Sequence, residues 1–350
     1  MSPRALASIL AFVVVLGCRA GPAPGGAGAA DARGGWALAV HGGAGTMDPG
    51  TPPERLQPYR DALRAALEYG RDRLARGDAA LDVVEAVVQR LEDDPQFNAG
   101  RGAVFNERGE HELDAAIMDG ATLRCGAVTG IRTVRHPIAL ARAVMERTRH
   151  VLLMGAGAEQ FADSLDLERV DNTWFDTEPR RRALERVLQE RAQEGGQEGG
   201  QEGGIARAPR DPRDGYGTVG CVARDVHGRL AAATSTGGLT GKRWGRVGDT
   251  PLVGAGTWAC GWAAVSGTGT GEEFMRHAVG RTVAARMQFG GQTLQQAADA
   301  VVFDTLRPDD GGLIAVDRDG NLAAPFNSSG MYRGLADSGG RFEVKVFREE

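Results

Sequence analysis

Thr218 carries a hydroxyl group that could act as a nucleophile, and it follows Gly217 directly. Two short apolar runs, residues 219–223 and 230–234, flank a turn that ends at Gly228, a pattern that predicts a β-hairpin. Thr218 would open the first strand, where the preceding glycine lets the backbone bend and leaves the hydroxyl accessible. This placement suits a nucleophile, and it suits an ordinary turn equally well.

Other groups that amide hydrolysis requires lie before and after this hairpin. Arg246 stands three positions before Asp249, hydroxyl groups occur in the segments 234–236 and 267–270, and Asn98 lies shortly before two glycines, Gly100 and Gly102. Each feature alone is typical of a small-residue turn or of a surface ion pair. Together they bring hydroxyls, backbone N–H groups, a fixed cation and an acid into one protein, as an amide-hydrolysing site needs.

The composition predicts a globular protein that can bury a large core. The chain has 350 residues, of which 42% are apolar, and its 52 glycines suit a structure of sheets and tight loops. A net charge of −5 argues against nucleic acid as a partner. His111 and His136 lack metal-ligand spacing, and so we expect no catalytic cofactor.

The first residues predict export. Residues 1–18 combine one positive charge, an apolar stretch and small residues before Cys18, as in a secretory signal that is too short to span a membrane. The end of this segment resembles a bacterial lipobox, which would place a lipid on Cys18; simple cleavage nearby is the alternative. Residues 19–35 form a Gly/Ala/Pro linker, and we expect a protein of the periplasm or cell envelope, tethered to the membrane by lipid only.

In the remaining chain, residues 36–350, strands and helices alternate, which predicts one folded domain of α/β architecture. A repeat of Gln, Glu and Gly with no apolar residue predicts a disordered linker at about residues 190–212. The expected elements are strands at 36–40, 112–120, 151–154 and 342–346, and helices around 56–67, 81–91 and 138–145.

Motifs spread over the chain carry a family resemblance. From about Trp36 to the C-terminus the sequence closely resembles the plant-type asparaginase and isoaspartyl dipeptidase family of N-terminal nucleophile hydrolases. The motifs occur in the family's order, which makes the resemblance specific. They are HGGAGT (41–46), FNAGRGAVF (97–105), ELDAAIMDG (112–120), GTVG (217–220), TSTGG (234–238), GRVGDTPLVGAG (245–256), GTGTGE (267–272), GGLIAVD (311–317) and PFNSSGMYRG (325–334).

The resemblance implies a fold and a processing event. The fold would be a four-layer αββα sandwich of the N-terminal nucleophile hydrolase type. Autoproteolysis between Gly217 and Thr218 would give an α chain, residues 36–217, and a β chain, residues 218–350. Cleavage would free the α-amino group of Thr218, whose ordinary pKa of roughly 8 leaves a neutral fraction near physiological pH. That amine can serve as the base for the hydroxyl of the same residue.

Motif matching assigns catalytic roles. Thr236 would hydrogen-bond the Thr218 hydroxyl, and Asn98 matches a family position near the nucleophile. Thr268 and the backbone N–H of Gly269 would stabilise the oxyanion and contact the substrate.

Motif matching also assigns a substrate-binding set. Arg246 would bind the substrate's α-carboxylate, and Asp249 would accept a hydrogen bond from its α-ammonium group. Gly271 would contact the same ammonium group through its carbonyl oxygen. The implied substrates are L-asparagine and β-aspartyl dipeptides, with L-aspartate as the product.

The resemblance further implies a structural sodium ion and a homodimer of cleaved αβ units. The sodium would be held by backbone carbonyl groups of the loop from Leu91 to Arg101. Its ligands would be Leu91, Glu92, Asp94, Phe97, Ala99 and Arg101.

The chain departs from the family pattern at two positions. Tyr216 stands where many relatives have His, and Gly241 stands where Asn is common, so cleavage rate and substrate preference could differ. Two other functions are considered. A glycosylasparaginase shares blocks such as TSTGG, although PFNSSGMYRG and GTGTGE fit the dipeptidase branch better. The alternative from another class is an uncleaved envelope protein that binds ligands without turnover.

Overall fold

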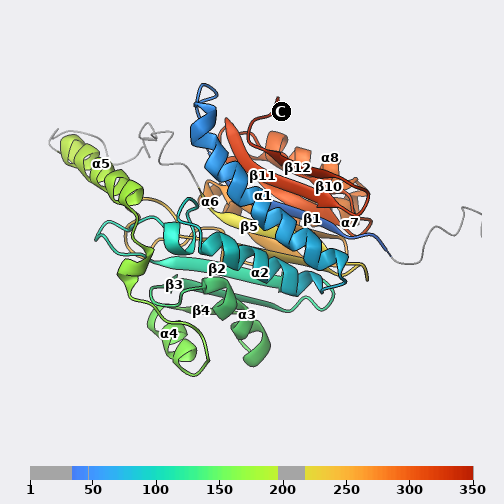
Figure 1. Ribbon diagram of the computed structural model, residues 1–350, viewed down its shortest axis with the longest axis horizontal. Helices are drawn as coiled ribbons and strands as arrows, with labels where there is room; N and C mark the ends of the chain where they lie inside the picture. Colours follow the sequence, from blue (N-terminus) through green and yellow to red (C-terminus); the bar gives the residue numbers. More distant parts are fainter. Residues whose placement is uncertain (1–33, 46, 196–216, 350) are drawn as a thin grey trace, which may run out of the picture. The chain divides into compact units, whose positions relative to one another are not determined.

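Two β-sheets form the centre of the chain (Figure 1). A computed structural model describes residues 34–45, 47–195 and 217–349, and the residues from Arg33 onward belong to one compact unit. The large sheet has eight strands in the order β12-β11-β1-β5-β6-β2-β3-β4, and the small sheet has four in the order β10-β9-β8-β7. The strands are β1 Ala37–Gly45, β2 Leu113–Asp119, β3 Cys125–Ile131, β4 Leu152–Met154, β5 Val219–Arg224, β6 Leu230–Thr236, β7 Thr257–Ala259, β8 Ala263–Gly269, β9 Gly311–Asp317, β10 Leu322–Ala323, β11 Gly330–Asp337 and β12 Phe342–Lys345.

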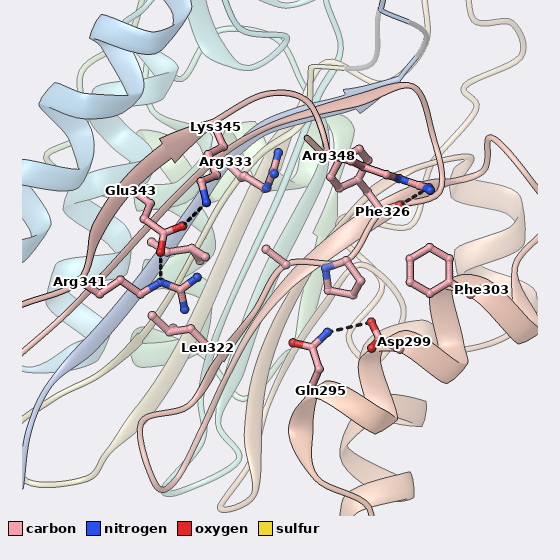
Figure 2. Close-up of a pocket in the computed structure, with 13 residues that line it drawn as sticks. Gln295, Asp299, Phe303, Leu322, Phe326, Arg333, Arg341, Glu343, Lys345 and Arg348 are labelled. Carbon is pink, nitrogen blue, oxygen red and sulfur yellow. Dashed lines mark hydrogen bonds and ion pairs between the residues drawn. The ribbon is translucent and has the colours of Figure 1, made fainter. Parts of the chain in front are cut away.

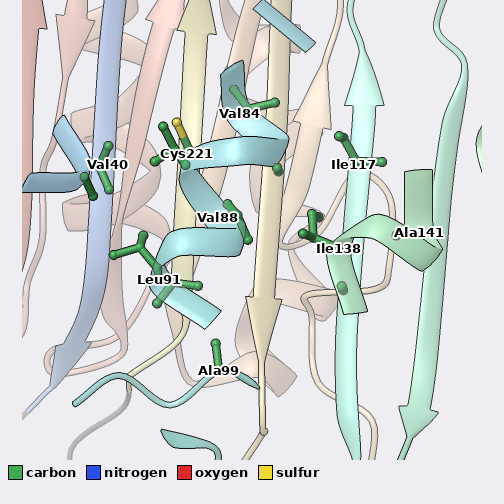
Figure 3. Close-up of a cluster of buried hydrophobic side chains, with 14 of the residues drawn as sticks. Val40, Val84, Val88, Leu91, Ala99, Ile117, Ile138, Ala141 and Cys221 are labelled. Carbon is green, nitrogen blue, oxygen red and sulfur yellow. The ribbon is translucent and has the colours of Figure 1, made fainter. Parts of the chain in front are cut away.

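Helices cover the outer face of each sheet. One apolar core joins α1, α2 and α3 to the large sheet, and Figure 3 shows Val84, Val88 and Leu91 of α2 beside Val40 of β1 and Cys221 of β5. A second core joins α7, α8 and the following π-helical turn to the small sheet. The helices are α1 Pro53–Ala75, α2 Ala80–Glu92, α3 Pro137–Arg147, α4 Gly155–Asp163, α5 Glu178–Gly195, α6 Gly271–Arg276, α7 Val279–Gly290 and α8 Leu294–Asp299.

A third apolar core lies between the two sheets. Along β1, Leu38 and Val40 belong to the core on the helix side, whereas Ala37 and Ala39 belong to the core shared with the small sheet. This alternation follows from the two-residue period of a strand. The core between the sheets combines alanines such as Ala232 and Ala264 with larger side chains such as Ile314 and Met331.

Several strand ends meet at one edge of the sheets. In the large sheet His41 of β1 pairs with Gly220 of β5, and Asp114 of β2 pairs with Thr236 of β6. In the small sheet β8 pairs with β9 up to Gly269. The end of β1, the start of β5, the end of β6 and the start of β2 are therefore neighbours.

The structure confirms an α/β fold and most of the expected elements, with two differences. The strand expected at 36–40 is longer in the structure, because His41 to Gly45 continue β1 through an irregularity in its pairing with β11. The backbone groups of this segment form hydrogen bonds with neighbouring strands, and the local sequence does not indicate which strands will be neighbours. Helix α5 runs to Gly195, into the start of the linker expected at 190–212.

The signal segment 1–18 lies outside the described residues, as do most of the linker 19–35 and the rest of the linker after Gly195. Within residues 34–45, 47–195 and 217–349, no helix is long and apolar enough to cross a membrane.

Candidate active site

Thr218 lies directly before β5, and its hydroxyl contacts a second hydroxyl. Thr218 Oγ1 is 3.0 Å from Thr236 Oγ1 at the end of β6. The backbone N–H of Gly238 donates to Thr236 Oγ1 over 3.0 Å. Thr236 is buried and Thr218 is half-buried, so the pair is held by protein groups while Thr218 keeps access to solvent.

Asn98 holds the peptide that precedes Thr218. Its backbone N–H donates to the carbonyl oxygen of Gly217 over 2.9 Å. A β-carbon on Gly217 would lie 2.7 Å from the backbone nitrogen of Asn98, so glycine permits this approach. The Asn98 amide donates to the Gly238 carbonyl over 2.8 Å and accepts from the Val104 N–H over 2.9 Å. The backbone of Asn98, rather than its side chain, therefore reaches the Gly217–Thr218 bond.

A buried histidine holds the carbonyl of Thr218 itself. His41 Nδ1 is 3.0 Å from the Thr218 carbonyl oxygen, which can only accept, and so Nδ1 carries the hydrogen. Burial lowers the pKa of His41 to about 3, against the raising effect of this hydrogen bond, and the ring is neutral. Its Nε2 accordingly accepts from Ser266 of β8 over 2.9 Å. Ser266 is 2.7 Å from Thr234, to which Thr257 donates over 2.7 Å.

Thr268 lies two residues after Ser266 in the same strand. The backbone N–H of Ala44 donates to Thr268 Oγ1 over 3.2 Å, which ties the end of β8 to the end of β1. Gly269 ends β8 and pairs with Gly311 of β9. The residues predicted to bind the oxyanion thus lie on the strand that supports His41.

Arg246, Asp249 and Gly271 meet in one cluster. A β-carbon on Gly271 would lie 2.8 Å from Arg246 Nη2 and 2.9 Å from Asp249 Oδ1, so only glycine fits between them. Arg246 Nε and Nη2 donate to the two carboxylate oxygens of Glu272, each over 2.9 Å. This bidentate contact fixes the guanidinium plane.

Asp249 is a buried carboxylate with unmet hydrogen-bonding capacity. Its Oδ2 has no hydrogen-bond partner within the described part of the chain. Burial raises the pKa of Asp249 to about 7, and the positive charge of Arg246 opposes this effect. A cationic ligand group placed against Oδ2 would supply the missing partner and favour the ionised form.

Two glycines let backbone carbonyl groups of the loop 91–102 pack closely within the loop. A β-carbon at Gly100 would collide with the carbonyl oxygen of Glu92, and one at Gly102 with that of Phe97, so glycines let these carbonyls approach the loop. The Glu92 carboxylate accepts from the Ser235 hydroxyl over 2.6 Å, which fastens the loop to β6. Burial raises the pKa of Glu92 to about 8. In the described residues, no group of His, Cys, Asp and Glu side chains forms a metal cluster.

Two cavities lie at different places relative to this site. The cavity in Figure 2, of about 290 Å³, is lined by residues such as Phe303, Arg341 and Glu343, and by none of the predicted site residues. A cavity of about 620 Å³ is lined by Asp114, Lys242 and Arg246, and so shares Arg246 with the predicted site.

Sequence reasoning missed His41, Ser266 and Glu272 as parts of the site. His41 is the first residue of the motif HGGAGT, but its fully buried position in β1 is a consequence of strand pairing. Ser266 alternates with Thr268 on β8, a two-residue spacing that places both hydroxyls on one face. Glu272 directly follows Gly271 in the motif GTGTGE, so an acidic partner for Arg246 could have been sought at this position.

The site combines hydroxyl groups, backbone N–H donors, a fixed cation and a buried carboxylate. These are the groups that a hydrolase needs. The chain belongs to the asparaginase family, whose model, described as "Asparaginase", matches residues 34–346.

Similar proteins cover nearly the whole folded chain. An isoaspartyl peptidase of Salmonella typhimurium is 48% identical over 89% of this chain and 98% of that protein. An isoaspartyl peptidase of Escherichia coli is 45% identical over 89% of this chain and 96% of that protein. A plant-type L-asparaginase of Thermococcus kodakarensis is 41% identical over 84% of this chain and 94% of that protein.

The neutral, buried state of His41 predicts a pH-dependent stability difference. The unfolded chain gains a proton at His41 below pH 6.5, whereas the folded chain gains it only near pH 3. The stability that His41 contributes is therefore present above pH 6.5 and is lost as the pH falls towards 3. We expect the free energy of unfolding of the parent protein to fall, relative to that of His41→Gln, across this interval.

Urea unfolding between pH 7 and pH 4 measures this difference. Both proteins should carry Thr218→Ala, so that chain cleavage does not enter the comparison, and His150→Gln at an exposed position is the matched control. A stability difference between the parent and His41→Gln that is the same at every pH would contradict a neutral His41.

Proposed function

We propose that this chain is a threonine amidohydrolase that releases L-aspartate from β-aspartyl dipeptides and from L-asparagine. Relatives that are 48% and 45% identical are named isoaspartyl peptidases, and one that is 41% identical is named an L-asparaginase. The observation that carries the proposal is the hydroxyl pair of Thr218 and Thr236, at 3.0 Å, directly after a carbonyl group that Asn98 holds.

The first step of the proposal is cleavage of the chain between Gly217 and Thr218. Thr218 Oγ attacks the Gly217 carbonyl carbon, the C–N bond breaks, and the hydroxyl proton ends on the freed amine. The Asn98 N–H already contacts the oxygen that becomes negative during this attack. Water then hydrolyses the ester, which leaves a carboxylate on Gly217 and a free α-amino group on Thr218.

Turnover would use the new N-terminus as its own base. The neutral amine of Thr218 takes the proton of its hydroxyl, which attacks the β-carbonyl of the substrate. Ammonia or an amino acid leaves, and water hydrolyses the resulting ester to release aspartate. Thr268 and the Gly269 N–H would stabilise the oxyanion, and one such donor is worth about 3 to 4 kcal/mol in other enzymes.

Substrate recognition would follow from the cluster around Gly271. Arg246, oriented by Glu272, would bind the α-carboxylate of the aspartyl group. The unpartnered Oδ2 of Asp249 and the carbonyl of Gly271 would accept from its α-ammonium group. Since the pKa of free Asp249 is about 7, binding of the ammonium group below pH 7 would release a proton from Asp249.

We also propose the finer architecture that the family implies. The two sheets, with helices packed outside each of them, support a four-layer αββα sandwich whose cleaved chains stay interlocked. The assembly would be a homodimer of αβ units.

A sodium ion in the loop 91–102 is a further part of the proposal. The carbonyl groups of Leu91, Glu92, Asp94, Phe97, Ala99 and Arg101 would hold it, and the ion would stiffen the loop that carries Asn98. Thermal unfolding in sodium chloride and in choline chloride at equal ionic strength tests this role. We expect a higher midpoint in sodium, and equal midpoints would contradict it.

Residues 1–18 support export to the periplasm or cell envelope, with a lipid on Cys18 as the tether. Incorporation of labelled palmitate into the protein and its loss in Cys18→Ala would support this anchor. An unlabelled product would contradict it.

The activity is tested by comparing three substrates. We expect ammonia release from L-asparagine and aspartate release from β-aspartyl-leucine, both faster than release from a glycosylated asparagine. Thr218→Ala should lower both activities by at least about a thousandfold, because it removes the nucleophile and the base together. Thr122→Ala, at an exposed turn, is the matched control.

Each alternative function gives its own result. Preference for the glycosylated substrate would indicate a glycosylasparaginase. Ligand binding without turnover, on a chain that stays in one piece, would indicate an envelope binding protein.

A further inference from the structure

Apart from Arg246, the residues that line the cavity of about 620 Å³ have no role in the proposed catalytic steps. Its wall includes the start of β2, the end of β3, one side of α4 and the segment 242–247. β2, β3, β4 and α4 lie together at one side of the large sheet (Figure 1). We call this space the side cavity.

The side cavity begins one strand beyond Thr236. Asp114 of β2 pairs directly with Thr236 of β6, and Val219, the residue after Thr218, pairs with Ser235. Residues paired directly across strands share a face of the sheet. Thr218, Thr236 and Asp114 therefore form a row across three strands. At about 4.8 Å per strand spacing, Asp114 lies roughly 10 Å from Thr218.

Asp114 carries an unsatisfied oxygen in the wall of this cavity. The residue is 1% exposed, and its Oδ1 accepts from the Thr129 hydroxyl over 2.6 Å and from the Gly130 N–H over 3.0 Å. Its Oδ2 has no hydrogen-bond partner within residues 34–45, 47–195 and 217–349. A buried carboxylate oxygen in this state is unfavourable until a donor reaches it.

The other acids of the wall already have donors. Glu159 accepts from the backbone of Arg132 over 2.6 Å and of Thr133 over 3.0 Å. Asp163 pairs with Arg169 over 2.6 Å, and Glu112 pairs with Arg108 over 3.2 Å. Among these acids, Asp114 is therefore the one whose free oxygen can accept a hydrogen bond from a ligand.

The cations of the wall are also held in place. Lys242 is 6% exposed, and its ammonium group donates to the Glu112 carbonyl over 2.6 Å. Arg246 is held by Glu272. The side cavity is thus lined by fixed positive groups and by Asp114, whose Oδ2 has no donor in the described part of the chain.

We propose that the side cavity receives the leaving residue of a β-aspartyl dipeptide, and that Asp114 Oδ2 accepts a hydrogen bond from the end of that residue's side chain. The inference rests on the proposed function and adds a substrate preference to it. The leaving residue starts at the bond that Thr218 attacks, and one residue of backbone spans about 3.5 Å. A side chain the length of glutamine would extend this reach along the row to Asp114. The preferred class is thus a long side chain that ends in an N–H donor.

Two isosteric substrates test this preference. β-Aspartyl-glutamine and β-aspartyl-glutamate differ only in whether the side chain ends in an N–H donor or in a charged acceptor. We expect kcat/KM to favour the glutamine dipeptide by at least about tenfold, since a buried acceptor discriminates strongly against a second acceptor. Equal values, or a preference for glutamate, would overturn the proposal.

Asp114→Asn replaces the proposed hydrogen-bond acceptor, Oδ2, by a hydrogen-bond donor. Its amide oxygen can keep the contacts with Thr129 and Gly130, which puts an N–H donor where Oδ2 stands. We expect the preference to disappear or to invert towards glutamate. Because the readout is a ratio of two substrates, it does not depend on how much of the variant folds. Asp319→Asn, at an exposed position, is the matched control and should keep the glutamine preference.

A second variant covers the case in which Asp114→Asn is inactive. Ala156 is exposed and lines the side cavity, and Ala156→Trp would narrow it. We expect kcat/KM for both dipeptides to fall relative to that for L-asparagine, which has no leaving residue. An unchanged ratio would overturn the proposal, whereas a wild-type protein inactive on all three substrates would refute the proposed function instead.

Discussion

The structure depends most on how the peptide groups around Thr218 are held. Asn98 donates to the carbonyl before Thr218, His41 to the carbonyl of Thr218, and Thr236 contacts the hydroxyl. These groups come from the loop after α2, from β1 and from β6, so they meet only when β5 lies between β1 and β6. Since buried polar groups without partners destabilise a fold, assembly of the sheet and assembly of the site are one process.

Buried negative charge is the second constraint on the site. Asp249 and Asp114 each keep one carboxylate oxygen without a partner in the described part of the chain. Such groups reduce the stability of the free protein, and a ligand that brings a donor removes this penalty. Asp249 suits the α-ammonium group of an aspartyl substrate, and Asp114 suits a donor farther along the same row. Specificity would then arise from hydrogen bonds that the free protein lacks.

Local patterns in the sequence predicted the elements but not their neighbours. Apolar periodicity located α1 and α2, and turn residues located the β5–β6 hairpin, because both signals act within a few residues. His41 was hidden in a glycine-rich segment, since its place in β1 depends on pairing with β5 and β11. Family motifs indicated Asn98, but its contact through the backbone N–H could not be predicted. Every residue except proline has this group, so the identity of the side chain does not indicate which N–H will make the contact.

The measurement that tests the account most directly is mass spectrometry with N-terminal sequencing of the purified protein. If the Gly217–Thr218 peptide, whose carbonyl group accepts from Asn98, is positioned to break, the protein will consist of two fragments, the second of which begins at Thr218. Thr218→Ala will then give a single chain. An active wild-type protein that remains one intact chain, or is cut at another bond, would contradict the central claim.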